Sequence, residues 1–126
     1  MLPDDVKTIV NRFVDEPWNQ GKVDVIDELC DPDYTVRYGT DREPLGGRDF
    51  IKNAILENRA KIPDFQAKVT EMIIEGDRVA YEWMMSGTED GAEFLNVGMT
   101  ILHFRGGKII DDRFIEDHVK AAQTTP

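Results

Sequence analysis

The second half of the chain alternates between amphipathic segments and short glycine turns, and this pattern constrains the fold more than any other feature. Residues 65–74, 78–88, 93–104 and 108–117 each have the composition of a strand. The turns between them are Glu75-Gly76-Asp77, Glu89-Asp90-Gly91 and Arg105-Gly106-Gly107. Glycine supplies the positive φ that tight hairpins need. Consecutive hairpins build an antiparallel sheet, so we predict a four-strand meander.

The first half of the chain is typical of helices. Apolar residues at helical spacing predict a helix over residues 3–16, with Pro3 at its start and Pro17 ending it. Shorter patterns predict helices over 23–29 and 49–61, and a β-branched, aromatic stretch predicts a strand over 34–38. Three helices followed by a meander indicate an α+β domain.

Size and charge narrow the class of protein. The 126 residues suit one domain, 1–126, in which residues 121–126 read as a frayed tail. A net charge of −10 argues against binding to nucleic acid or anionic membranes, which need clustered Lys and Arg. No signal peptide or apolar run of membrane-spanning length is visible. A single cysteine, Cys30, with two histidines predicts no metal site and a reducing, cytoplasmic setting.

Hairpin geometry predicts which side chains share a face of the sheet. If Gly106-Gly107 is a two-residue turn, Arg105 pairs with Lys108, and the strands then stay in register. One face, mainly apolar, receives the aromatic and polar residues Tyr81, Trp83, Met85, Asn96, Thr100, Leu102, Arg113 and Asp117. The opposite face receives Val97, Met99, Ile101, Ile110 and Phe114.

Arg113 and Asp117 are unusual residues for a covered face, and two interpretations remain open. Asp117 can lie in water at the strand end while Arg113 pairs with Asp111 or Glu82 at the rim. Alternatively, both line a cavity, where burial raises a carboxyl pKa toward values useful for acid–base chemistry. An apolar pocket with a few converging polar groups is the default candidate for a site.

An ordered set of short motifs resembles the SnoaL-like polyketide cyclase branch of the NTF2-like superfamily over about residues 6–117. The motifs are Trp18-Asn19-Gln20-Gly21, Leu29-Cys30-Asp31-Pro32-Asp33-Tyr34, Ile62-Pro63-Asp64-Phe65, Glu75-Gly76-Asp77-Arg78-Val79, Trp83, Gly87-Thr88 and Phe104 with Gly107-Lys108-Ile109. The resemblance implies a cone, in which a curved antiparallel sheet wraps around three N-terminal helices and encloses a pocket. It also implies cofactor-free aldol closure of a polyketide ester, with an Asp on the last strand as acid/base.

By its spacing from Gly107-Lys108-Ile109, that Asp falls on Asp117. Two departures from the family pattern are plain. The family's His and Trp after the Gly-Lys-Ile turn correspond to Asp112 and Arg113, and its Pro-Pro-Thr-Gly segment between the middle strands is missing. The missing segment is expected to open the pocket mouth.

The region around Thr35-Val36-Arg37-Tyr38 also resembles ketosteroid isomerase. That enzyme needs an Asp base and an oxyanion hole made of a Tyr and a protonated Asp. By resemblance these positions fall on Tyr38, Phe13 and Leu102, so the required groups are absent. Steroid isomerisation by that mechanism is not expected.

Two functions therefore stand as hypotheses. The first is a small cofactor-free enzyme, a cyclase, isomerase or hydrolase, acting on an apolar carbonyl compound, with Asp117 as acid/base and Tyr38 and Arg113 assisting. The second is a non-catalytic module that binds an apolar or aromatic ligand or serves dimerisation. The predicted substrate-binding residues are Phe13, Trp18, Tyr81, Trp83, Met85, Asn96, Thr100 and Leu102. The apolar opposite face predicts a homodimer.

Overall fold

The computed structural model describes the backbone of residues 1–120 and the side chains of residues 1–117. It contains the helices α1 (Pro3–Val14), α2 (Val25–Leu29) and α3 (Arg48–Lys61), and a π-helical turn, η1 (Asp15–Asn19). Its strands are β1 (Cys30–Tyr38), β2 (Gln66–Glu75), β3 (Arg78–Glu89), β4 (Ala92–Arg105) and β5 (Lys108–Lys120). The predicted α+β class, with three helices and a curved sheet, is confirmed. The frayed tail predicted for residues 121–126 lies outside the described residues.

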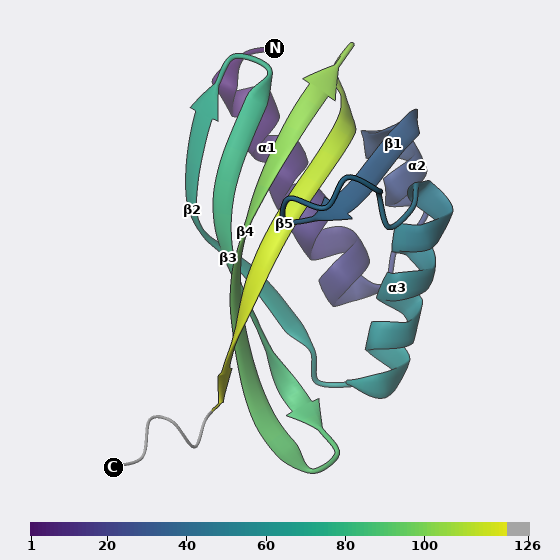
Figure 1. Ribbon diagram of the computed structural model, residues 1–126, viewed down its shortest axis with the longest axis vertical. Helices are drawn as coiled ribbons and strands as arrows, with labels where there is room; N and C mark the ends of the chain where they lie inside the picture. Colours follow the sequence, from purple (N-terminus) through teal and green to yellow (C-terminus); the bar gives the residue numbers. More distant parts are fainter. Residues whose placement is uncertain (121–126) are drawn as a thin grey trace.

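The strands form one strongly curved sheet in the order β1-β5-β4-β3-β2, and the helices lie on its concave side (Figure 1). The predicted meander accounts for β2 to β5, which pair antiparallel in three consecutive hairpins. β1 forms the other edge of the sheet and runs parallel to β5. After β1, helix α3 and the loops around it carry the chain across the sheet to β2 at the opposite edge. The sheet thus places the end of β1 beside the middle of β5.

The register of the last hairpin differs from the prediction by one residue. Arg105 pairs with Lys108 and Phe104 with Ile109, as expected, but His103 pairs with Asp111. Ile110 is the extra residue of a β-bulge at this point. Because side chains alternate between faces, one extra residue exchanges the faces of every residue that follows it.

The bulge overturns the predicted placement of four residues. Asp117 pairs with Val97 and Arg113 with Ile101, so both belong to the convex face, and both side chains are exposed. Phe114, predicted on that face, pairs with Thr100 on the concave face, and Ile110 lies at the bulge itself. The structure bears out the placement of Asp117 in water, whereas Asp111 pairs with Arg37 and His103 rather than with Arg113.

Helix α1 crosses the concave side and supplies the centre of the core with Val6, Val10 and Phe13. Pro17 was predicted to end this helix, but the chain continues through it as the wider π-turn η1. A proline clashes with the carbonyl four residues back in an α-helix, and the wider turn avoids that contact.

The π-turn is fixed on two sides by hydrogen bonds. The Asn19 side chain donates to the carbonyl of Ala67 at 2.8 Å and accepts from its N–H at 2.7 Å, which attaches η1 to β2. The Arg59 guanidinium of α3 donates to the carbonyls of Trp18 and Asn19 at 2.9 and 2.7 Å. These bonds hold Trp18 between the sheet and α3. No helix among residues 1–120 is long and apolar enough to cross a membrane.

Gly98 offers a direct test of the packing inside the curved sheet. A Cβ atom at this position would lie 2.1 Å from the Trp83 ring and 2.6 Å from the Ile115 carbonyl oxygen. Gly98→Ala should therefore lower the free energy of unfolding by roughly 1–3 kcal/mol, the usual cost of overpacking. Urea unfolding measures this, with Leu56→Ala, a half-exposed position on α3, as the control. Equal losses in the two variants would contradict the packing described here.

Candidate functional site

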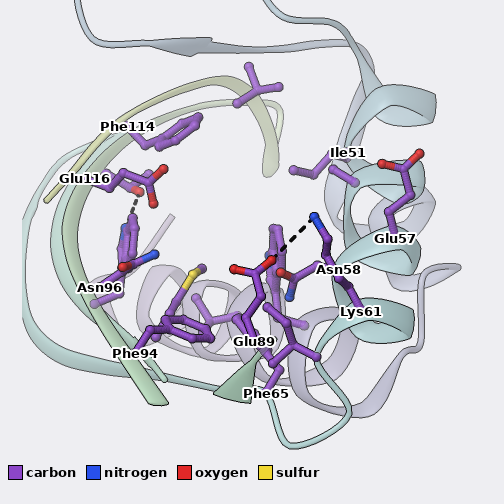
Figure 2. A pocket seen from close by; sticks show the side chains of 18 of the residues that line it. Ile51, Glu57, Asn58, Lys61, Phe65, Glu89, Phe94, Asn96, Phe114 and Glu116 are labelled. Atoms are coloured by element: carbon purple, nitrogen blue, oxygen red, sulfur yellow. Dashed lines mark hydrogen bonds and ion pairs between the residues drawn. The ribbon is translucent and has the colours of Figure 1, made fainter. Parts of the chain in front are cut away.

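A cavity of about 1300 Å³ lies between α3 and the concave side of the sheet (Figure 2). Helix α3 forms one wall, strands β3 to β5 form the opposite wall, and α1 and η1 close one end. Aromatic rings dominate the lining: Phe13, Trp18, Phe50, Phe65, Tyr81, Trp83, Phe94 and Phe114. A space of this size and composition suits an apolar molecule of several rings.

The structure brings most of the predicted binding residues to this cavity. Phe13, Trp18, Tyr81, Trp83, Met85, Asn96 and Thr100 line it, and their role in binding a ligand stays a prediction. Leu102 is fully buried in the core and does not line the cavity.

The three residues predicted to be catalytic are not brought together. Tyr38 is 39% exposed, and its hydroxyl lies 3.5 Å from the backbone carbonyl oxygen of Glu116. Asp117 and Arg113 project from the convex face because the bulge at Ile110 shifts the register of β5. None of the three side chains lines the cavity.

A different carboxylate, that of Asp112, lies at the inner wall of the cavity. The bulge in β5 turns it to the concave side, where it is 4% exposed. The Tyr34 hydroxyl donates a hydrogen bond to its Oδ2 atom at 2.6 Å. Tyr34 comes from β1, and the parallel pairing that sets Val36 beside Asp112 brings the two side chains together. Among residues 1–117, Oδ1 has no hydrogen-bond donor.

Burial governs the ionisation of this group. It raises the pKa of Asp112 to about 7; the hydrogen bond from Tyr34 opposes that rise and the charge of Asp111 adds to it. Burial and the Asp112 charge also raise the pKa of Tyr34 well above its ordinary value. Cys30, which is buried nearby, has its pKa raised to about 12 by the same two causes. Tyr34 therefore keeps its proton, and Cys30 is a thiol rather than a nucleophile.

A second hydrogen-bonded group lies on β3 and β4, on the same wall. The Trp83 indole N–H donates to Thr100 Oγ1 at 2.9 Å. Burial raises the pKa of Tyr81 well above its ordinary value, the Asp112 charge adds to this, and a hydrogen bond with Thr100 opposes it. Tyr81 is thus a protonated donor within the electrostatic reach of Asp112.

The rest of the lining carries its charges nearer the opening. Lys61 on α3 and Glu89 on β3 form an ion pair at 3.4 Å, and Glu116 projects from the sheet toward the interior (Figure 2). Within the described residues, no three His, Cys, Asp or Glu side chains gather in a geometry that could hold a metal ion.

The family model of SnoaL-like polyketide cyclases matches residues 8–124 of this sequence. The chain belongs to the SnoaL-like polyketide cyclase family. Solved structures of similar fold include a protein named as a SnoaL-like polyketide cyclase from Jannaschia sp. CCS1, with a TM-score of 0.80 and 20% identity, covering 93% of this chain and 90% of that one. A search of curated proteins found no match.

Two further solved structures show the same architecture. A polyketide cyclase, so named, from Acidithiobacillus ferrooxidans has a TM-score of 0.76 and 23% identity, covering 93% of this chain and 91% of that one. AclR from Streptomyces galilaeus, named as a hydroxylase, has a TM-score of 0.76 and 18% identity, covering 94% and 82%. At such identities these likenesses show a shared fold, which hosts more than one activity.

Sequence reasoning missed Asp112, Tyr34 and Glu116. All three depend on the bulge or on the parallel pairing of β1, and neither has a local sequence signal. One indication was available: Asp111, Arg113 and Asp117 place charge at three of the four alternate positions from 111 to 117, which favours a solvent-facing side. The carboxylates at positions 112 and 116 obscured it.

The raised pKa of Asp112 predicts how stability depends on pH. The native state keeps this proton up to about pH 7, whereas the unfolded chain loses it near pH 4, so the free energy of unfolding falls as pH rises through this range. Between pH 5 and pH 8 the loss should be about 2–3 kcal/mol. Asp112→Asn keeps an acceptor for Tyr34 and should abolish that loss. Parallel pH dependence of wild type and variant in urea unfolding would show that Asp112 ionises normally.

Proposed function

We propose that this SnoaL-like protein is a cofactor-free acid–base enzyme that acts on an apolar carbonyl compound, with Asp112 as the acid/base. One observation carries the proposal: a carboxyl group with a pKa of about 7 lies in the wall of an apolar cavity. A catalytic acid or base works best when its pKa lies near the working pH. Asp112 takes the role that the sequence suggested for Asp117.

The chemistry follows from the surroundings of Asp112. Its ionised form removes a proton from a carbon beside a carbonyl group, and its protonated form returns a proton to carbon or oxygen. The hydrogen bond from Tyr34 fixes the orientation of the carboxyl group and occupies Oδ2, which leaves Oδ1 for the substrate. The resulting carbon nucleophile can attack a second carbonyl of the same molecule, which is the closure that a cyclase performs.

A negative oxygen develops on the substrate when the proton leaves carbon. Tyr81 lies on the same wall, keeps its proton because of its raised pKa, and donates to that oxygen. Thr100 accepts a hydrogen bond from the Trp83 indole and is hydrogen-bonded to Tyr81, so it fixes the position of the Tyr81 hydroxyl. Placing a donor before charge develops lowers the barrier without reorganisation of solvent.

The ligand and the setting follow from the same features. The aromatic lining favours an apolar or aromatic molecule of several rings as substrate. We also propose a cytoplasmic location, in which the one cysteine, Cys30, stays a free buried thiol.

The acid–base role can be tested without the natural substrate. β-Tetralone, an apolar ketone, exchanges its α-hydrogen atoms for deuterium in D₂O, and mass spectrometry follows the exchange. Asp112→Asn should reduce the enzyme-catalysed rate by roughly 10²–10⁴-fold, because the variant has no proton acceptor. The rate of the wild type should rise with pH around 7, as the carboxyl group ionises.

Asp117→Asn is the matched control, since it removes the same charge from the convex face and should exchange at the wild-type rate. If Asp112→Asn also exchanges at the wild-type rate while binding the ketone, Asp112 is not the acid/base. The non-catalytic ligand-binding module would then be the better description.

We further propose that two copies pair through the convex face of the sheet. Met99, Ile101 and Ile115 are 51%, 44% and 51% exposed there, a large apolar surface for a monomer. Arg113 and Asp117 lie on the same face with opposite charges. A two-fold contact can therefore match each charge with its opposite on the second copy.

Sedimentation equilibrium at micromolar concentration should give the mass of a dimer for the wild type. Met99→Arg places a charge at the centre of the patch and should shift the protein to monomer. The cavity lies on the other side of the sheet, so binding of apolar ligands should remain. A monomeric wild type would contradict the proposed contact.

A further inference from the structure

Three residues on neighbouring strands form a row across the concave side of the sheet. Trp83 on β3 pairs with Gly98 on β4, and Gly98 pairs with Glu116 on β5. Gly98 has no side chain, and a Cβ atom at this position would lie only 2.1 Å from the Trp83 ring. The ring therefore occupies the space that a side chain would need. The indole therefore lies over Gly98, next to the strand that carries Glu116, and Trp83 and Glu116 both line the cavity.

The carboxylate of Glu116 projects into the cavity (Figure 2). The Phe114 ring lies on one side of it, and Asn96 and the Phe94 ring lie on the other. Its side chain makes no hydrogen bond or ion pair with any of residues 1–117. An unpaired carboxylate is costly in apolar surroundings, whereas beside an aromatic ring it suits a cationic partner.

The described residues that line the cavity hold little positive charge to neutralise Glu116. Among the described lining residues Lys61 is the one basic side chain, and its ammonium group already pairs with Glu89 at 3.4 Å. Glu57 and Glu93 add further negative charge to the lining. The described part of the lining is therefore net acidic, which favours a cation over an anion.

From this arrangement we propose that the ligand is a polycyclic or otherwise apolar molecule bearing a protonated amine. The ammonium group binds the Glu116 carboxylate and lies against the Trp83 and Phe114 rings, while the apolar body fills the aromatic part of the cavity. Free carboxylic acids of the same shape are rejected. This inference uses the cavity of the proposed function and names the class of substrate that it accepts.

Three fluorescent probes with one skeleton test the proposal: pyrenylmethylamine, pyrenylmethanol and pyrenecarboxylate. At pH 8 the wild type should bind the amine about tenfold more tightly than the alcohol, and the carboxylate most weakly. Glu116→Gln, which keeps the size of the side chain, should lower affinity for the amine about tenfold and leave affinity for the alcohol within twofold. Asp117→Asn makes the same change in net charge on the convex face and should leave all three affinities unchanged.

A wild type that binds the carboxylate as tightly as the amine would overturn the proposal. Equal loss of amine and alcohol affinity in Glu116→Gln would also overturn it, because Glu116 would then only shape the wall. The probes undergo no reaction, so this result is independent of the deuterium exchange that tests Asp112. A failed amine preference leaves the acid–base role standing, and a failed acid–base role leaves the amine preference standing.

Discussion

The extra residue in β5 is the feature on which the rest of the site depends. Without the bulge at Ile110, the concave side would receive Arg113 and Asp117, and Asp112 would face water. With it, one carboxyl group is removed from solvent and held by Tyr34, and a second projects into the cavity. The cost of burying Asp112 appears as a raised pKa rather than as a buried charge, because the group can take up a proton.

The two strands that flank β5, one antiparallel and one parallel to it, complete the wall of the cavity. β4 runs antiparallel and brings Thr100 and Gly98 beside Phe114 and Glu116. β1 runs parallel at the other edge and brings Tyr34 to Asp112. A meander alone would have left this edge of β5 unpaired and Asp112 without its donor. The helical first half of the chain thus contributes to the site through the strand embedded in it, as well as by covering the sheet.

The sequence was sufficient for the class of fold and for much of the cavity wall. Glycine turns located the three hairpins, and the two-residue alternation on β3 correctly grouped Tyr81, Trp83 and Met85 on one face. The acid–base residue could not be found in the same way, because alternation is exact only while the ladder is unbroken. The position of a bulge depends on how the sheet curves around the helices. The sequence Ile109-Ile110 does not show that one of the two residues has no partner on the neighbouring strand. The π-turn at Pro17 is a similar case, since a proline that should end the helix is accommodated by hydrogen bonds from distant Ala67 and Arg59.

The absence of a side chain at Gly98 also has a consequence for related sequences. Because Gly98 has no side chain, the Trp83 ring can lie over its backbone, beside the strand that carries Glu116. A homologous chain with any larger residue at this position must give up either the bulky ring or its position over the backbone. The residues at positions 83 and 98 are therefore expected to vary together, because a chain that keeps the tryptophan needs the glycine beneath it.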